Sequence, residues 1–129
     1  MEIKTFGEWL GGLDLSFWGT AQHKVVPAQF FERQDGEGAV LLDVRSSEEV
    51  GQLALPFALH IPIDELPDRW LEVPADRLVA TFCSSVTRAV LAWAYLQLRG
   101  LDKVRILDAG YEELTAQLKP GQVYRRRKR

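Results

Sequence analysis

The stretch LVATFCSSVTRAVLAWAYLQLRG, residues 78–100, decides the fold of this chain. Its first five residues, four of which are apolar, have the length and pattern of a strand. From Thr87 or Arg88 to Arg99 the residues favour a helix, which Gly100 closes. A buried strand that leads through a short loop into a long helix is the repeating unit of α/β proteins. The loop between them contains the only cysteine of the sequence, Cys83.

Further strands and helices alternate on both sides of this unit. We expect strands at residues 25–26, 39–42, 58–61 and 104–107. Helices are expected over residues 28–33, after Ser46 or Ser47, over 63–70 with Asp64 as its cap, and over 110–119. Residues 35–38 are predicted to form a turn, and Pro120 with Gly121 to end the last helix. The alternation predicts an α/β domain with a mostly parallel sheet and helices on both faces.

The composition limits the class of protein. With 129 residues, 47% of them hydrophobic and 26% charged, the chain suits one domain with its own core. A single cysteine excludes a disulfide framework within the chain and a zinc site built from several thiolates. The longest apolar run, residues 89–96, is shorter than the ~20 residues of a membrane-spanning helix. The first residues lack a signal-peptide pattern, so we expect a cytoplasmic protein, where a lone thiol persists.

Charge divides the chain into a body and a tail. Five of the 16 basic residues are residues 125–129, which leaves 11 basic and 18 acidic residues and a net charge of −7 in residues 1–124. An acidic body argues against nucleic acid as a partner. We expect an aromatic-rich N-terminal extension over 1–22, an α/β domain over 23–120 and a solvated basic tail over 121–129. The extension is expected to pack on its own domain, with a contact to a second copy of the chain or to a partner as the alternatives.

Two loops at the carboxyl ends of predicted strands carry the candidate site residues, because α/β proteins bind ligands at that edge of the sheet. The first loop is Asp43-Val44-Arg45. We expect Asp43 to accept N–H groups of the loop and Arg45 to pair with Glu48 or Glu49. Both residues would then support the site without reacting themselves.

The second loop, residues 83–88, has the pattern of an anion-binding nest. Backbone N–H groups of Ser84, Ser85, Val86, Thr87 and Arg88 can face inward at the positive end of the following helix. This setting favours the thiolate of Cys83, which is the reactive form of a cysteine, and Arg88 offers a planar fork to an anionic substrate. The alternative is that Cys83 is a buried small hydrophobic residue, as many free cysteines are. We expect no metal site.

In order and spacing, several segments resemble the rhodanese-like family. In the first half these are LLDVR at 41–45, the acids at 48 and 49, the proline at 56, the alanine at 58 and IP at 61–62. In the second half they are VATF at 79–82, the Cys-x4-Arg loop at 83–88 and ILDAGY at 106–111. The resemblance covers about residues 25–119. It implies a small α/β domain around a five-stranded parallel sheet, with the cysteine in a central loop.

The resemblance also implies an activity, because the active members of this family are sulfurtransferases. By this likeness Cys83 takes a sulfane sulfur from a donor such as thiosulfate and becomes a persulfide. It then passes the sulfur to a thiophilic acceptor, which is cyanide in vitro and a protein or small thiol in the cell. The loop amides up to Arg88 would stabilise the persulfide, and the Arg88 side chain would help to bind the donor. No cofactor is implied, since the covalent intermediate divides the transfer into two easier steps.

Departures from the family pattern keep a second function open. Related phosphatases use a Cys-x5-Arg loop, so the shorter spacing here favours sulfur over phosphate. The family often has Gly at the position of Val86, and a β-branched residue resists positive φ. Either this position is not left-handed or the loop is shaped differently. Leu53-Ala54 also replaces the usual Gly-His. These departures motivate the alternative of a catalytically weak rhodanese-like module that binds a partner protein.

Overall fold

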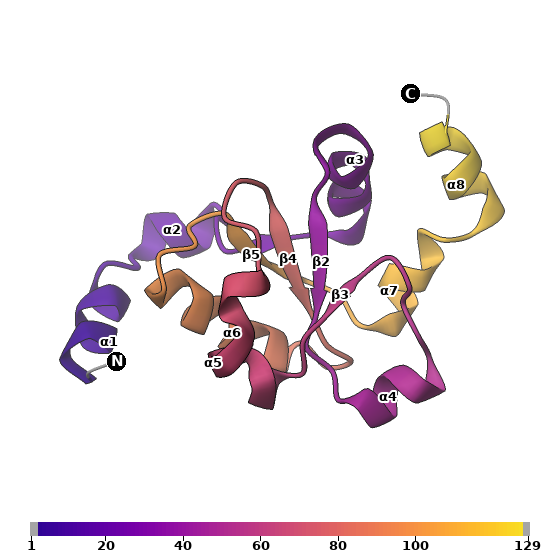
Figure 1. Ribbon diagram of the computed structural model, residues 1–129. Helices are drawn as coiled ribbons and strands as arrows, with labels where there is room; N and C mark the ends of the chain where they lie inside the picture. The colour runs from indigo at the N-terminus through magenta and orange to yellow at the C-terminus, as the bar shows by residue number, and fades with distance from the viewer. Residues whose placement is uncertain (1–2, 128–129) are drawn as a thin grey trace.

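A five-stranded parallel sheet forms the centre of the molecule (Figure 1), a computed structural model that describes residues 3–127. The strand order is β1-β5-β4-β2-β3, and each pair of neighbours is parallel. The strands are β1 (Lys24–Val25), β2 (Val40–Asp43), β3 (Leu59–His60), β4 (Val79–Phe82) and β5 (Val104–Leu107). The predicted α/β class is therefore confirmed, and the sheet is parallel throughout.

Helices cover both faces of the sheet (Figure 1). Their bounds are α1 (Ile3–Gly11), α2 (Leu15–Gly19), α3 (Pro27–Glu37), α4 (Ser47–Gln52), α5 (Leu66–Arg69), α6 (Thr87–Leu98), α7 (Tyr111–Ala116) and α8 (Pro120–Arg127). Short 3-10 turns at Ile63–Glu65 and Trp70–Glu72 flank α5. One hydrophobic cluster joins the sheet to α5 and α6, and the other joins it to α3 and α7. Val79 and Ala80 of β4 belong to different clusters, because successive strand residues point to opposite faces.

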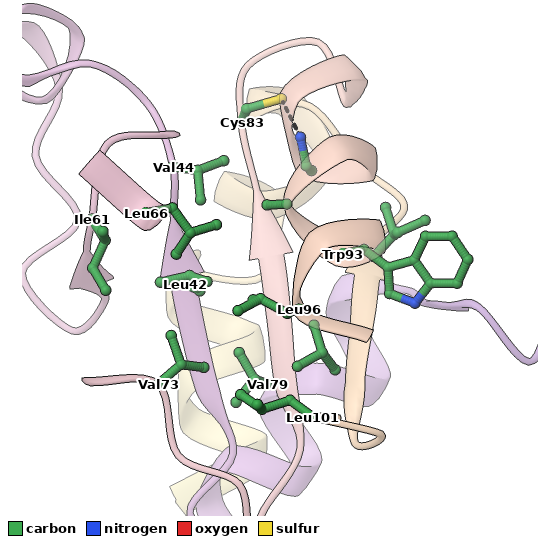
Figure 2. Packing of buried hydrophobic residues seen from close by; sticks show 14 residues of the cluster. Leu42, Val44, Ile61, Leu66, Val73, Val79, Cys83, Trp93, Leu96 and Leu101 are labelled. Carbon is green, nitrogen blue, oxygen red and sulfur yellow. Dashed lines mark hydrogen bonds between the residues drawn. The ribbon is translucent and has the colours of Figure 1, made fainter. Parts of the chain in front are cut away.

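The central strand β4 and the helix α6 set the position of the Cys83 loop. All four residues of β4 are buried between β2 and β5. Thr81 in this strand donates a hydrogen bond from Oγ1 to the carbonyl of Ala89 in α6, at 2.9 Å. On the same face, Trp93 and Leu96 of α6 pack into the core over the sheet (Figure 2). The first turn of α6 is thereby fixed against the end of β4.

Two predicted boundaries are wrong for reasons of backbone conformation. The turn predicted at residues 35–38 is the last turn of α3, which runs to Glu37. Gly36 is tolerated within the helix, and Gly38 supplies the left-handed end with φ of 71°. The helix predicted over residues 63–70 is a 3-10 turn followed by α5, and Asp64 is not its cap. Pro67 lies in the first turn of α5, where a missing N–H costs nothing.

The described part of the N-terminal extension, residues 3–22, packs on its own domain as expected. It contains two helices, α1 and α2. The rings of Trp9 and Phe17 lie 5.3 and 6.2 Å from the ring of Trp93, measured between centroids. Trp93 is 3% exposed, so the side chain of this α6 residue is covered where the aromatic side chains of the extension pack on it. An oligomer contact through the extension stays an untested prediction.

The predicted C-terminal stop is wrong, because Pro120 begins a helix. α7 ends at Ala116, and α8 starts at Pro120, where the fixed φ of proline suits a first helical position. Arg126 of α8 donates to the carbonyl of Gln117 at 2.9 Å, and its guanidinium lies 4.6 Å from the ring centroid of Phe31. The basic segment is therefore helical up to Arg127 and anchored through Arg126; the rest of the predicted tail, residues 128–129, lies outside the described residues. None of the described helices has the length and apolar character needed to cross a bilayer.

Candidate functional site

Cys83 follows directly after β4, at the carboxyl edge of the sheet, as predicted. Its side chain is 1% exposed, and Sγ accepts a hydrogen bond from the backbone N–H of Ala89 at 3.3 Å (Figure 2). Ala89 lies in the first turn of α6, where the helix dipole also favours a negative charge. The amide that contacts the sulfur is thus one residue beyond the stretch that the sequence indicated. The Ala89 N–H and the positive end of α6 thus both lie next to the Cys83 sulfur.

Val86 has a left-handed backbone conformation, with φ of 72° and ψ of −29°, and precedes the first residue of α6. Of the two alternatives that the sequence left open, the one in which this position avoids positive φ is wrong. A β-branched residue in such a conformation stores about 1–3 kcal/mol of strain. The packing of Val86 against the core cluster beneath α6 helps to hold it there. The loop therefore makes the turn into α6 at a cost that glycine would avoid.

Arg88 forms a two-pronged ion pair with Glu49. The distances are 2.6 Å from Nη1 to Oε1 and 2.9 Å from Nη2 to Oε2, and each side chain is 30% exposed. Ser84 joins this pair, because its Oγ lies 3.3 Å from Nη2 of Arg88 and 3.4 Å from Oε2 of Glu49. These bonds to Glu49 raise the pKa of the Arg88 guanidinium, and the neighbouring Cys83 adds to the effect. The sequence prediction that Arg88 binds the donor stays a prediction, and such a donor would compete with Glu49.

The other two predicted loop residues, Ser85 and Thr87, are exposed. Ser85 lies in the loop between Cys83 and α6, and Thr87 is the first residue of α6. The structure therefore brings together Cys83, Ser84 and Arg88 with Glu49, and leaves these two side chains directed to solvent.

Asp43 and Arg45 form a buried ion pair behind the site. Arg45 is 0% exposed and Asp43 is 1% exposed. The Nε and Nη2 atoms of Arg45 lie 2.9 Å and 2.7 Å from Oδ1 and Oδ2 of Asp43, and Nη1 donates to the hydroxyl of Tyr111 at 3.0 Å. Burial opposes the charge of Arg45, but the bonds to Asp43 and Tyr111 outweigh it and raise the pKa of the guanidinium.

The predicted pairing of Arg45 with Glu48 or Glu49 is wrong. Arg45 instead forms its ion pair with Asp43, two residues away, and Glu49 forms an ion pair with Arg88. The expectation that Asp43 accepts a loop N–H is confirmed, since it accepts the backbone N–H of Arg45 at 3.1 Å. Both residues connect β2 to the loop before α4 and do not contact Cys83 through any of these bonds.

Sequence reasoning missed the functional contacts of three residues. The sequence indicated Glu49 as a partner of Arg45 and as part of the family pattern, but not as a partner of Arg88. Tyr111 fixes Arg45 through its hydroxyl group. Gly110 approaches the active loop so closely that a Cβ on it would lie 3.2 Å from the carbonyl oxygen of Ser84. Tyr111 and Gly110 belong to the ILDAGY segment, which the sequence marked only as part of the family pattern. That pattern did not indicate what either residue contacts.

Comparison with known proteins identifies the family of this chain. A family profile described as "Rhodanese-like domain" matches residues 26–117. A sulfurtransferase of Allochromatium vinosum is 38% identical over 76 residues, which cover 59% of this chain and 71% of that protein. The putative sulfurtransferase YtwF of Bacillus subtilis is 29% identical over 84 residues, covering 65% of this chain and 81% of that protein.

A solved structure gives the same fold. The human single-domain sulfurtransferase TSTD1 superposes with a TM-score of 0.61 at 24% sequence identity. The superposition covers 73% of this chain and 96% of the human one. At that identity the likeness concerns the fold, and the predicted rhodanese-like architecture is confirmed.

Proposed function

Because this chain belongs to the rhodanese-like domain family, we propose that it is a sulfurtransferase in which Cys83 carries sulfane sulfur as a persulfide. The observation that carries the proposal is the contact between Sγ of Cys83 and the N–H of Ala89 at the start of α6. A sulfur atom held there, beside the Arg88 guanidinium, is suited to carry negative charge both as thiolate and as persulfide.

The reaction has two steps. The Cys83 thiolate attacks the sulfane sulfur of the donor, a new S–S bond forms, and the donor's remaining group leaves with the electron pair of the broken bond. The thiophilic acceptor then attacks the outer sulfur of the Cys83 persulfide, and the thiolate is regenerated. The acceptor would be cyanide in an assay and a protein or small thiol in the cell. The donor's sulfane sulfur already has the oxidation level of the outer sulfur of a persulfide, so neither step needs an oxidant.

The test is the intact mass of the reduced full-length chain before and after exposure to sulfane donors, with cyanide added last. Thiosulfate, a small-thiol persulfide and cysteine desulfurase with cysteine are the donors. We expect a gain of one sulfur on the protein, its loss to cyanide as thiocyanate, and no gain in Cys83→Ser. Absence of the gain from all three donors, with the fold intact, would refute the proposal and favour the alternative, a rhodanese-like binding module. A cytoplasmic location, where the thiol stays reduced, is part of the same proposal.

A further inference from the structure

Arg88 is the one arginine of residues 83–88, and its charge is neutralised by the carboxylate of Glu49 in α4. Glu49 of α4 contacts both terminal nitrogens of Arg88, and Ser84 contacts the same group from the side. A planar guanidinium presents two parallel N–H groups along the edge formed by Nη1 and Nη2, and both of these groups contact Glu49. An anionic donor that needed this fork would have to displace Glu49.

The position of Glu49 is fixed before any donor arrives. Its Oε1 accepts the backbone N–H of Ser46 at 3.0 Å, and its own backbone N–H donates to Ser46 Oγ at 3.2 Å. This capping box anchors the carboxylate at the start of α4. The Arg88 guanidinium, helped by the Ser46 N–H, holds the pKa of the Glu49 carboxyl well below its usual range. Glu49 is therefore charged at every pH at which the protein would be assayed.

We propose that Glu49 determines the class of sulfur donor, by occupying the Arg88 fork that the sulfonate group of thiosulfate would need. Cys83 is then loaded from thiol persulfides in preference to thiosulfate. The inference rests on the proposed sulfurtransferase function. A thiol persulfide presents its sulfane sulfur without an oxyanion group, so it does not compete with the carboxylate for Arg88.

The two donors differ in what leaves the site. With thiosulfate, the Cys83 thiolate bonds to the outer sulfur, the S–S bond breaks, and sulfite leaves with the electron pair and two negative charges. With a thiol persulfide, the thiolate bonds to the terminal sulfur, which keeps its proton, and a thiolate with one negative charge leaves. Both reactions end in the same Cys83 persulfide. A departing dianion needs a free cation nearby, and Arg88 is already paired.

The experiment compares three full-length proteins: wild type, Glu49→Gln and Glu48→Gln. Glutamine completes a capping box as glutamate does, so Glu49→Gln keeps the start of α4 while removing the charge that holds Arg88. Glu48 is exposed and lies in the same first turn of α4, so its variant matches the change in net charge. The rate of Cys83 persulfide formation is measured by intact mass with thiosulfate and with the persulfide of 2-mercaptoethanol, whose carbon chain bears no charge. Persulfidated cysteine desulfurase, as a third donor, separates a protein source from a small thiol.

We expect Glu49→Gln to load from thiosulfate roughly 10- to 100-fold faster than wild type, the range of one or two charge-assisted hydrogen bonds. Loading from either persulfide should change less than about threefold, well below that range. Glu48→Gln should match wild type with all donors. An unchanged thiosulfate rate in Glu49→Gln, or an equal gain with the persulfides, would overturn the inference while leaving the sulfurtransferase function in place. Failure of all donors to load wild type would overturn both.

Discussion

Removing one partner of the ion pair between Asp43 and Arg45 is expected to destabilise the whole domain. In Arg45→Met the carboxylate of Asp43 stays buried, at 1% exposure, without the guanidinium that now contacts both of its oxygens. Breaking a buried pair in this way costs about 3–5 kcal/mol in the free energy of unfolding. The Tyr111 hydroxyl loses its partner in the same variant, which adds to the loss. The cost is a large fraction of the roughly 5–15 kcal/mol of a typical domain.

The assay is urea unfolding followed by tryptophan fluorescence, with Trp93 in the core as a reporter. With a denaturant slope of roughly 1–3 kcal/mol per molar, the midpoint should fall by about 2 M. The double variant Asp43→Leu with Arg45→Met removes both charges and fills the space with apolar groups. It should lose less stability than the two single variants added together, by at least about 2 kcal/mol. Arg33→Met, which breaks an exposed pair with Glu37, is the control and should leave the midpoint nearly unchanged.

Two results would refute this reasoning. The first is a loss of less than about 1 kcal/mol in Arg45→Met, which is the range of a surface pair. The second is a double variant whose loss equals the sum of the single losses, which would mean that the two charges do not interact. If Arg45→Met does not fold at all, the double variant still decides between these readings, since it carries no unpaired charge.

Three further predictions concern the Cys83 loop, the carboxylate of Glu49 and the C-terminal helix α8. Gly110→Ala should slow Cys83 persulfide formation several-fold with little change in the melting temperature, because the new methyl group pushes on the Ser84 carbonyl; an unchanged rate would show that the loop adjusts freely. Since the folded-state pKa of Glu49 is depressed, its stabilising effect is present above the ordinary carboxyl pKa and is lost as pH falls below it. Between pH 7 and pH 3 the urea midpoint should therefore fall more in wild type than in Glu49→Gln. An equal fall in both proteins would contradict the ion pair. Arg126→Ala removes the contact with Phe31 and should expose α8 to trypsin, visible as faster cleavage within residues 119–127 by mass spectrometry; cleavage at the wild-type rate would show that other contacts hold the helix.

The order of strands and helices and the place of Cys83 could be read from the sequence because they depend on local patterns. A mostly apolar segment such as residues 78–82 is typical of a strand buried on both faces, and the following helix is expected to begin at the end of the polar loop. The cap at Ser46 and the glycine after α6 follow from the same short-range rules. Errors arose where local signals compete, as at Gly36, which a helix tolerates, and at Pro120, which both ends and begins helices.

The tertiary structure decided which charges pair around the loop. Glu49 and Arg88 are 39 residues apart in the sequence, and only the parallel arrangement of β2 and β4 brings the start of α4 to the start of α6. From the sequence, Arg45 was an equally good partner for Glu49, since both lie within one turn of each other. The guanidinium of Arg45 instead pairs with Asp43 in the protein interior, where an unpaired charge would strongly destabilise the fold. The sequence thus indicated which residue types form the site, but not which of them pair. Charged side chains pair according to their distance in space, and local sequence patterns do not determine that distance.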